Sequence, residues 1–136
     1  MQEFATTVVG NLVTDPRMRV MPSGAQVCSF RIAVTPRFRR PGSGEWCEGA
    51  SMSVAVSCWR ALAENVTASL HRGDRVVVIG RMRQRGYLSP AGEERLLWEV
   101  EADLVAPDLG RQTADVHHPP RLPGGLIEGG APAGRG

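Results

Sequence analysis

The sequence predicts an all-β protein built as a small closed barrel of five strands, with one short helix between the third and fourth strands. Five segments carry the alternating or β-branched apolar pattern of strands, and only one segment has helical spacing. Compact turn signals such as Asp15-Pro16 separate the apolar runs. An OB-fold, a five-stranded Greek-key barrel, fits three strands followed by a helix and two more strands.

The five expected strands are residues 4–14, 26–35, 51–59, 75–85 and 95–105. Gly10 interrupts the first strand, as at a barrel bend or a β-bulge. In the second strand, period-two alternation predicts an inward set of Cys28, Phe30, Ile32 and Val34. In the third strand, the predicted inward set is Met52, Val54, Val56 and Cys58, and the outward set is Ser53, Ala55, Ser57 and Trp59.

The single helical pattern covers residues 61–70. Leu62, Val66 and Leu70 recur there at a spacing of four, which predicts one apolar face. Gly73 follows two basic residues and is a natural stop for the helix.

The composition changes near residue 106. Residues 107–136 hold five of the ten prolines and seven of the sixteen glycines, a composition that cannot bury enough apolar surface to offset the entropy of ordering. We therefore expect a binding domain over residues 1–110 and a flexible tail over residues 111–136. No run approaches the roughly 20 apolar residues of a membrane helix. The N-terminus also lacks the features of a signal peptide, so we expect a cytoplasmic, nucleoid-associated protein with no membrane partner.

The net charge is only +2, but all 16 basic residues are arginine. The planar guanidinium binds phosphate bidentately and also stacks on bases, so this composition is compatible with nucleic-acid binding. Codon bias in a GC-rich genome would produce the same composition, and the charge alone does not decide between the two explanations.

Sequence signatures of catalysis are absent. There is no GxxxxGK[ST] loop, no GxGxxG opening a helix and no HExxH, and His71, His117 and His118 have no Cys–His spacing suited to zinc. We therefore expect a protein that is not an enzyme and that needs no metal or cofactor. Free thiols are the default expectation for the three cysteines, with an intermolecular disulfide through Cys47 as the alternative.

One candidate binding feature lies on the fourth expected strand. Arg81, Arg83 and Arg85 alternate along it and share one face, and Tyr87 continues the same register. Such a row suits the phosphates of an extended nucleic-acid strand, and the aromatic ring offers a platform for a base. The alternative is an ordinary solvated face, but such a face usually mixes both signs of charge, whereas this strand carries one.

Two further candidates involve aromatic residues. Phe38 lies among Arg37, Arg39 and Arg40 before a Pro/Gly-rich turn, where exposed rings beside cations suit stacking on bases, although Phe38 could instead anchor the hairpin. Trp59 falls on the polar face of its strand among small residues, which leave its ring open for a base. The alternative is that Trp59 packs on the helix that follows. Trp98 lies in an apolar run and is interpreted as structural, and Trp46 is left undecided.

The sequence resembles the bacterial single-stranded-DNA-binding protein family. The segments that carry the resemblance are Val9-Gly10-Asn11-Leu12, Asp15-Pro16, Arg19, Pro22-Ser23-Gly24, Gly44-Glu45-Trp46, Cys58-Trp59-Arg60, Ala63-Glu64-Asn65 and Arg72-Gly73. They cover about residues 4–110. The resemblance implies an OB-fold homotetramer that wraps and protects single-stranded DNA in replication, recombination and repair. It also implies base-stacking roles for Phe38, Trp59 and Tyr87.

The chain departs from the family pattern in two places. Ser53 stands where the family usually has an aromatic residue, so one stacking platform is expected to be lost. The last residues, Gly134-Arg135-Gly136, lack the acidic tip ending in Pro-Phe that recruits partner enzymes, so such recruitment is not expected. Residues 105–116 resemble a segment that in some members hooks onto a neighbouring subunit, or they begin the linker.

Two other functions stay open at this stage. The chain could be an OB-fold protein that prefers RNA or serves a primosome, because nothing in the sequence reads a 2′-hydroxyl. It could also be a tetrameric scaffold with weakened DNA binding, a reading that the loss at Ser53 favours and the arginine row opposes.

Overall fold

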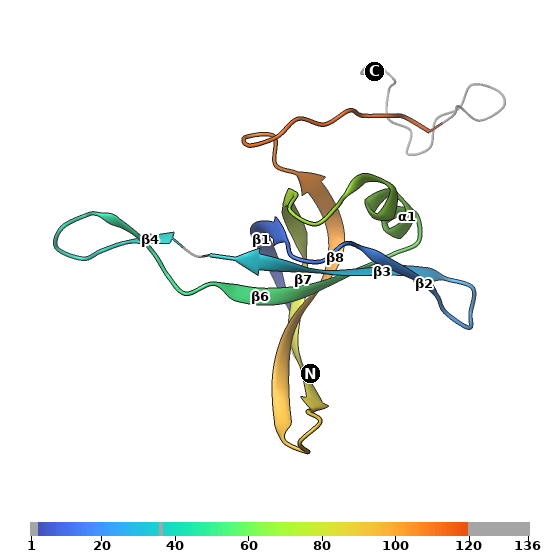
Figure 1. Ribbon diagram of the computed structural model, residues 1–136, viewed down its shortest axis with the longest axis horizontal. Coiled ribbons are helices and arrows are strands. Elements are labelled where there is room, and N and C mark those ends of the chain that lie inside the picture. The colour runs from blue at the N-terminus through green and yellow to red at the C-terminus, as the bar shows by residue number, and fades with distance from the viewer. Residues whose placement is uncertain (1–2, 36, 120–136) are drawn as a thin grey trace.

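The computed structural model describes residues 3–35 and 37–119 (Figure 1). Its elements in chain order are β1 Phe4–Leu12, β2 Arg17–Val20, β3 Gln26–Val34, β4 Arg37–Arg39, β5 Trp46–Glu48, β6 Met52–Trp59, α1 Arg60–Ser69, β7 Arg75–Leu88 and β8 Glu94–Pro107. The main sheet runs β1-β7-β8-β6-β3-β2, and an extra pairing of β1 with β3 closes it into a barrel of five strands. β6 and β8 are parallel, and the other neighbours are antiparallel. This is the predicted OB-fold order.

β1 and β2 share β3 as a partner. β1 pairs with β3 only at Asn11 and Leu12, and β2 pairs with the other end of β3. Sequence analysis did not assign a strand to β2, because four residues are too few to show a clear period. Gly10 marks the closure point: a Cβ there would collide with the carbonyl oxygen of Ala33, so only glycine lets β1 approach β3 so closely.

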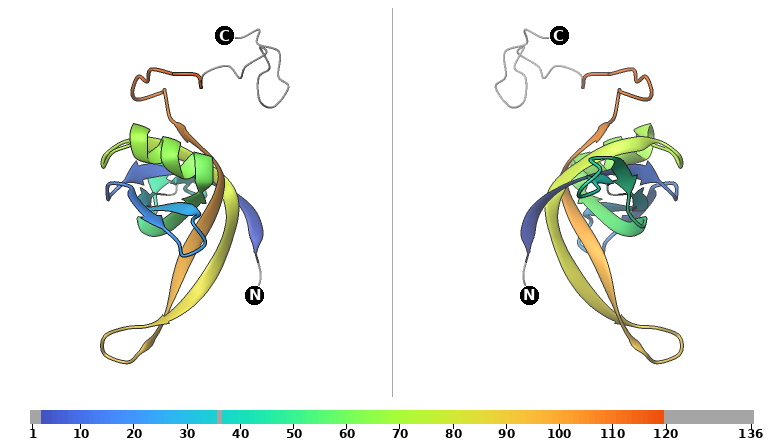
Figure 2. Two further views of the ribbon diagram at one scale, coloured as in Figure 1. Left: turned by 90° about the vertical axis from the view of Figure 1, so that its right-hand side faces the viewer. Right: turned by 90° about the vertical axis from the view of Figure 1, so that its left-hand side faces the viewer.

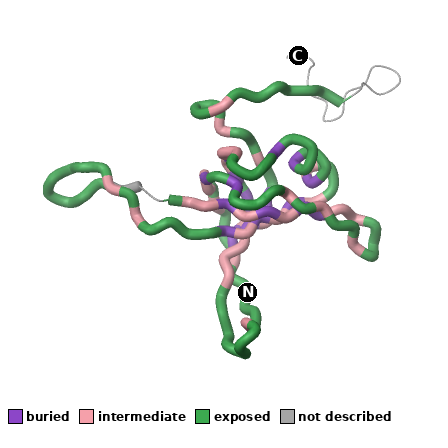
Figure 3. The backbone as a smooth tube through the Cα atoms, viewed as in Figure 1, coloured by how far each residue is buried: buried purple, intermediate pink, exposed green. Residues whose placement is uncertain are grey.

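The core lies where the barrel and α1 meet (Figure 3). The predicted inward residues of β3 and β6 are buried, with Val34 only partly buried, and Cys28 faces Cys58 across the strand pair. Met52 is a correction: it is 41% exposed, because it begins β6 beyond the end of the barrel core. The helix lies within one residue of the predicted range, and Ala63, Val66 and Leu70 bury its apolar face.

Two hairpins project from the barrel in different directions (Figures 1 and 2). β4 and β5 form a separate two-stranded sheet. β7 and β8 are each longer than expected and extend as an exposed hairpin past Arg85. Between Ile79 and Gly80 the register of β7 and β8 shifts, and Asp103 is the unpaired residue of this β-bulge. A Cβ at Gly80 would collide with backbone atoms of Glu101 and Ala102, so this crossing also requires glycine.

The segment after β8 is fastened to β7. Asp108 forms an ion pair with Arg75 at 3.1 Å, and the side-chain amide of Gln112 exchanges two hydrogen bonds with the backbone of Arg75. The predicted tail lies mostly in residues 120–136, which are outside the described residues, so the boundary at residue 110 and the subunit hook over 105–116 stay predictions. No helix in the described part is long and apolar enough to cross a membrane.

Candidate nucleic-acid interface

Trp59 lies at the point where the barrel turns into the helix. It is the last residue of β6 and is half-buried on the outer face, with extended backbone angles. Arg60 follows with a φ of 59°, a left-handed conformation that costs a non-glycine residue on the order of 1–3 kcal/mol. At this sharp turn the chain changes direction between β6 and α1. It leaves the indole beside a hollow rather than under α1.

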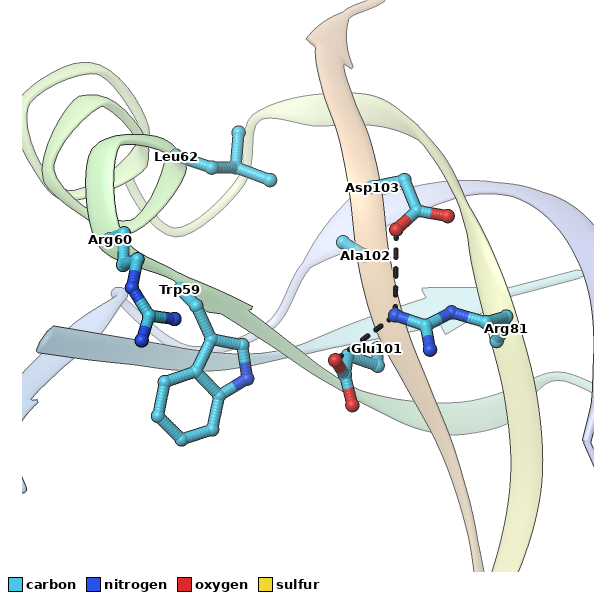
Figure 4. Close-up of a pocket in the computed structure, with 7 residues that line it drawn as sticks. All are labelled: Trp59, Arg60, Leu62, Arg81, Glu101, Ala102 and Asp103. Carbon is cyan, nitrogen blue, oxygen red and sulfur yellow. Dashed lines mark hydrogen bonds and ion pairs between the residues drawn. The ribbon is translucent and has the colours of Figure 1, made fainter. Parts of the chain in front are cut away.

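The hollow beside Trp59 has a volume of about 460 Å³ (Figure 4). Its lining residues are Trp59, Arg60, Leu62, Arg81, Glu101, Ala102 and Asp103. The structure therefore brings two of the predicted site residues, Trp59 and Arg81, to one place. Phe38 and Tyr87 belong instead to the two projecting hairpins (Figure 1).

The predicted arginine row faces a row of carboxylates, which corrects the expectation of a face with one sign of charge. Arg81 contacts Glu101 at 3.0 Å and Asp103 at 3.5 Å. Arg83 contacts Glu3 at 2.9 Å and Glu101 at 3.8 Å. Arg85 approaches Glu99 at 3.7 Å. The carboxylate of Glu101, followed by that of Asp103, raises the pKa of the Arg81 guanidinium above its ordinary value.

The acidic row comes from β8, and its register explains the pairing. Arg81 lies opposite Glu101 and Arg83 opposite Glu99, so the two alternating patterns share one outer face. The bulge at Gly80 adds Asp103 to that face. The sequence shows both rows, but only the register places them together. The predicted role of Arg81, Arg83 and Arg85 in binding phosphate stays a prediction, and it now requires the phosphate to compete with carboxylates.

Tyr87 lies near the tip of the β7–β8 hairpin and is 49% exposed. It lines a second surface hollow with Leu88, Arg95 and Leu96, among others. Leu88 and Leu96 are also largely exposed, so the tip offers a mixed aromatic and aliphatic surface next to a cation. An open ring in this setting can stack on a base.

The β4–β5 hairpin carries the second predicted cluster. Phe38 lies opposite Cys47 and Arg39 opposite Trp46 in its register. The Arg39 guanidinium lies 5.3 Å from the centre of the Trp46 ring, a cation–π distance. Trp46 is 58% exposed, so this undecided residue joins the candidate platforms. Arg40 is also exposed, and the side chains of Arg37 and Phe38 are not described, so their roles stay predictions.

Trp98 is structural, as interpreted from the sequence. It packs against the core cluster, and its ring lies edge-on to that of Phe4, with the two ring centres 6.3 Å apart.

Sequence analysis missed a group of arginines on the outer face of β2 and β3. Arg17 and Arg19 lie opposite Ser29 and Val27 of β3, and Arg31 lies on the same face. The alternation of Arg17 and Arg19 was the available signal, but four residues are too few to show a clear period.

Comparisons with known proteins identify the family. The Single-strand binding protein family matches residues 4–108, which span the whole barrel. The chain belongs to this family. A Single-stranded DNA-binding protein of Corynebacterium glutamicum is 50% identical over 115 residues, which are 85% of this chain and 51% of that protein. The chain thus spans about half the length of that relative. A protein of the same name from Mycobacterium tuberculosis is 45% identical over 93% of this chain and 77% of its own length.

Two solved structures of the family share the fold. The small single-stranded DNA-binding protein of Streptomyces coelicolor has a TM-score of 0.71 and 34% identity, covering 82% of this chain and 100% of its own. The second single-stranded DNA-binding protein of Mycobacterium smegmatis has a TM-score of 0.62 and 35% identity, covering 86% of this chain and 100% of its own. Both therefore align over their entire length with this chain.

Proposed function

We propose that this chain binds single-stranded DNA without sequence preference and protects it during replication, recombination and repair, and that it does so without catalysing a reaction. Bases stack on Trp59, Phe38 and Tyr87, and arginines hold the phosphates. Family membership over residues 4–108 supports this proposal, as do the relatives from Corynebacterium glutamicum and Mycobacterium tuberculosis, each named a Single-stranded DNA-binding protein.

The observation that carries the proposal is the position of Trp59. Its ring is half-buried on an outer face of the barrel and borders an open hollow rather than the core. Stacking on an aromatic ring is worth about 1–3 kcal/mol per base and tolerates any base, because every base has a π-face. A tryptophan in this place is suited to binding without sequence preference.

We also infer that the chain works as a homotetramer. Within the described residues, the first half of β1 pairs only with β7, so its other edge is open to a strand from a second copy. Phe4, Ile79 and Leu104 expose apolar surface on β1, β7 and β8, and a subunit contact would cover it. Sedimentation or light scattering at several concentrations measures the assembly, and a monomer throughout would contradict it.

The test of binding uses a variant with Trp59 as its only tryptophan, Trp46→Phe with Trp98→Phe. Titration with a single-stranded dT oligonucleotide should quench its fluorescence strongly, because the base contacts the indole. A duplex of matched length should not. RNA of the same length is the third arm: equal or tighter binding of RNA would favour the RNA-preferring alternative.

The matched control is the native chain with Trp59→Phe, which keeps a smaller stacking ring. Its affinity for dT should fall several-fold, while its thermal stability changes little. Absence of any response to single-stranded DNA in the native chain would overturn the proposed function and leave the scaffold alternative.

A further inference from the structure

We propose that the phosphate backbone of the bound strand runs over the outer face of β2 and β3, held by Arg17, Arg19 and Arg31, and that Ser53 orients Arg31 for this contact. This inference rests on the proposed function. It assigns the cationic contact to arginines of β2 and β3, which were not among the binding residues predicted from the sequence, and moves it away from the arginines of β7.

The three arginines share one face next to Trp59. Along the pairing register, Arg17 lies opposite Ser29, and Val27 lies between Arg19 on one side and Trp59 on the other. Arg31 lies two residues beyond Ser29 on the same face of β3, opposite Ala55 of β6. A strand stacked on Trp59 would therefore meet these guanidinium groups as it crosses from β6 to β2.

This face carries only positive charge. The sequences of β2, β3 and β6 contain no Asp or Glu. In the part of the chain that the structure describes, none of the three arginines forms an ion pair with a carboxylate. Their charge is available to a phosphate without displacing a partner.

The opposite side of Trp59 is acidic. Glu99 and Glu101 of β8 lie opposite Ala55 and Ser57 of β6, so they border the same outer face. Arg81 and Arg83 beyond them are engaged by these carboxylates and by Glu3. The face thus changes from cationic at β2 and β3, through neutral at β6, to acidic at β8. A polyanion on this surface is drawn toward β2 and β3 and repelled by β8.

Ser53 fixes Arg31 without neutralising it. The Nε of Arg31 donates a hydrogen bond to the Ser53 hydroxyl at 3.0 Å, and its backbone N–H donates to Thr14 at 3.1 Å. Of the side-chain donors of Arg31, only Nε has a partner among the described residues, so the Nη groups stay free for a phosphate oxygen. A guanidinium held in place by a neutral hydroxyl loses less side-chain entropy on binding than a free one.

The test measures how the affinity for a single-stranded dT oligonucleotide depends on salt. Each phosphate neutralised on a single strand contributes about 0.7 to the slope of log K against log salt. Arg17→Gln, Arg19→Gln and Arg31→Gln should each lower the slope by about that amount. The matched control is Arg75→Gln combined with Asp108→Asn, which removes the ion pair between the start of β7 and the segment after β8 without changing the net charge and should leave the slope unchanged. A lower slope in this control, with unchanged slopes in the three single variants, would overturn the inference.

The positioning role of Ser53 has its own readout. Ser53→Ala should weaken binding roughly two- to ten-fold, the worth of one hydrogen bond, with the salt slope intact. In the Arg31→Gln background the same substitution should have no effect, because nothing is left to orient. An equal loss in both backgrounds would contradict the role of Ser53. If the native chain binds no single-stranded DNA, the proposed function fails; if it binds and these variants bind equally well, only this inference fails.

Discussion

Gly80→Ala tests whether the bulge between β7 and β8 organises the outer face of the barrel. A Cβ at this position would come within 2.9 Å of Ala102 Cα and the Glu101 carbonyl carbon, and closer still to the Glu101 oxygen. All three atoms belong to the backbone of β8, so no side-chain rotation relieves the clash. The two strands would have to separate at a buried position where the barrel is closely packed.

Overpacking of this kind costs about 1–3 kcal/mol of unfolding free energy, and the backbone contacts place Gly80→Ala at the upper end. At about 4 °C per kcal/mol for a domain of this size, the midpoint of thermal unfolding should fall by about 10 °C. Gly86→Ala is the matched control on the same strand. Its Cβ would meet only the Arg95 carbonyl oxygen at 3.9 Å, an ordinary contact, so the unfolding free energy should change by less than about 0.5 kcal/mol.

The assay is urea and thermal unfolding followed by circular dichroism at one fixed protein concentration, because assembly would make the midpoint depend on concentration. Gly80→Ala should also move Asp103 relative to Arg81, since the bulge carries Asp103 to that face. Equal midpoints for the two variants would refute the reasoning, because they would show that β8 can yield at the crossing without cost.

Two further predictions concern groups away from the interface. Burial, with a smaller contribution from Cys28, raises the pKa of the Cys58 thiol to about 12. A thiol reagent at pH 8 should therefore modify Cys47 quickly and should modify Cys28 and Cys58 only after denaturation; rapid modification of all three in the native protein would contradict the buried pair. The Gly110 amide, and secondarily Arg75, hold the pKa of Asp108 below its ordinary value of 3.8. The contribution of Asp108 to the free energy of unfolding is therefore complete above pH 3.8 and is lost as the pH falls through the lowered pKa. The Gly110 amide resonance should titrate below pH 3.8 by NMR, and a midpoint at or above 3.8 would contradict this contact.

The fold could be predicted because strand alternation and the helix position survive in the sequence. β3 and β6 show clean period-two patterns, and their inward residues form the core. β2, β4 and β5 were missed because strands of three or four residues hold no measurable period and exist only through pairing with a neighbour. Tertiary pairing, not local preference, decides such short strands.

The charges of the candidate site were predicted less completely, because the ion pairs of an arginine depend on which residues lie opposite it on the neighbouring strand. Read alone, β7 presents a row of arginines, and only the register shows that Glu99 and Glu101 face it. The same limit hid Arg31, whose neighbours on the outer face come from β6 and from the bend near Thr14. The outer-face position of Trp59 was easier to predict, because a large ring on the polar side of a strand stands out in a single sequence.

Ser53→Trp should strengthen base stacking and weaken the phosphate contact of Arg31 at the same time. A tryptophan there would add a stacking platform worth about 1–3 kcal/mol per base. It would also remove the hydroxyl that accepts the Arg31 hydrogen bond, and a large ring would crowd that guanidinium on a face where Ser53 now leaves it room. The net gain in affinity for a dT oligonucleotide should therefore be smaller than in the Arg31→Gln background, where nothing is lost.

In a double-mutant cycle, the affinity of Ser53→Trp is compared with that of the native chain, and the affinity of Ser53→Trp with Arg31→Gln is compared with that of Arg31→Gln alone. The difference between the two gains separates base stacking from the lost support of Arg31. A gain that is equal in the two backgrounds would show that Arg31 does not need Ser53. No gain in either background would show that the bound strand does not pass over this position at all, which would place the path of the DNA away from the outer face of β3 and β6.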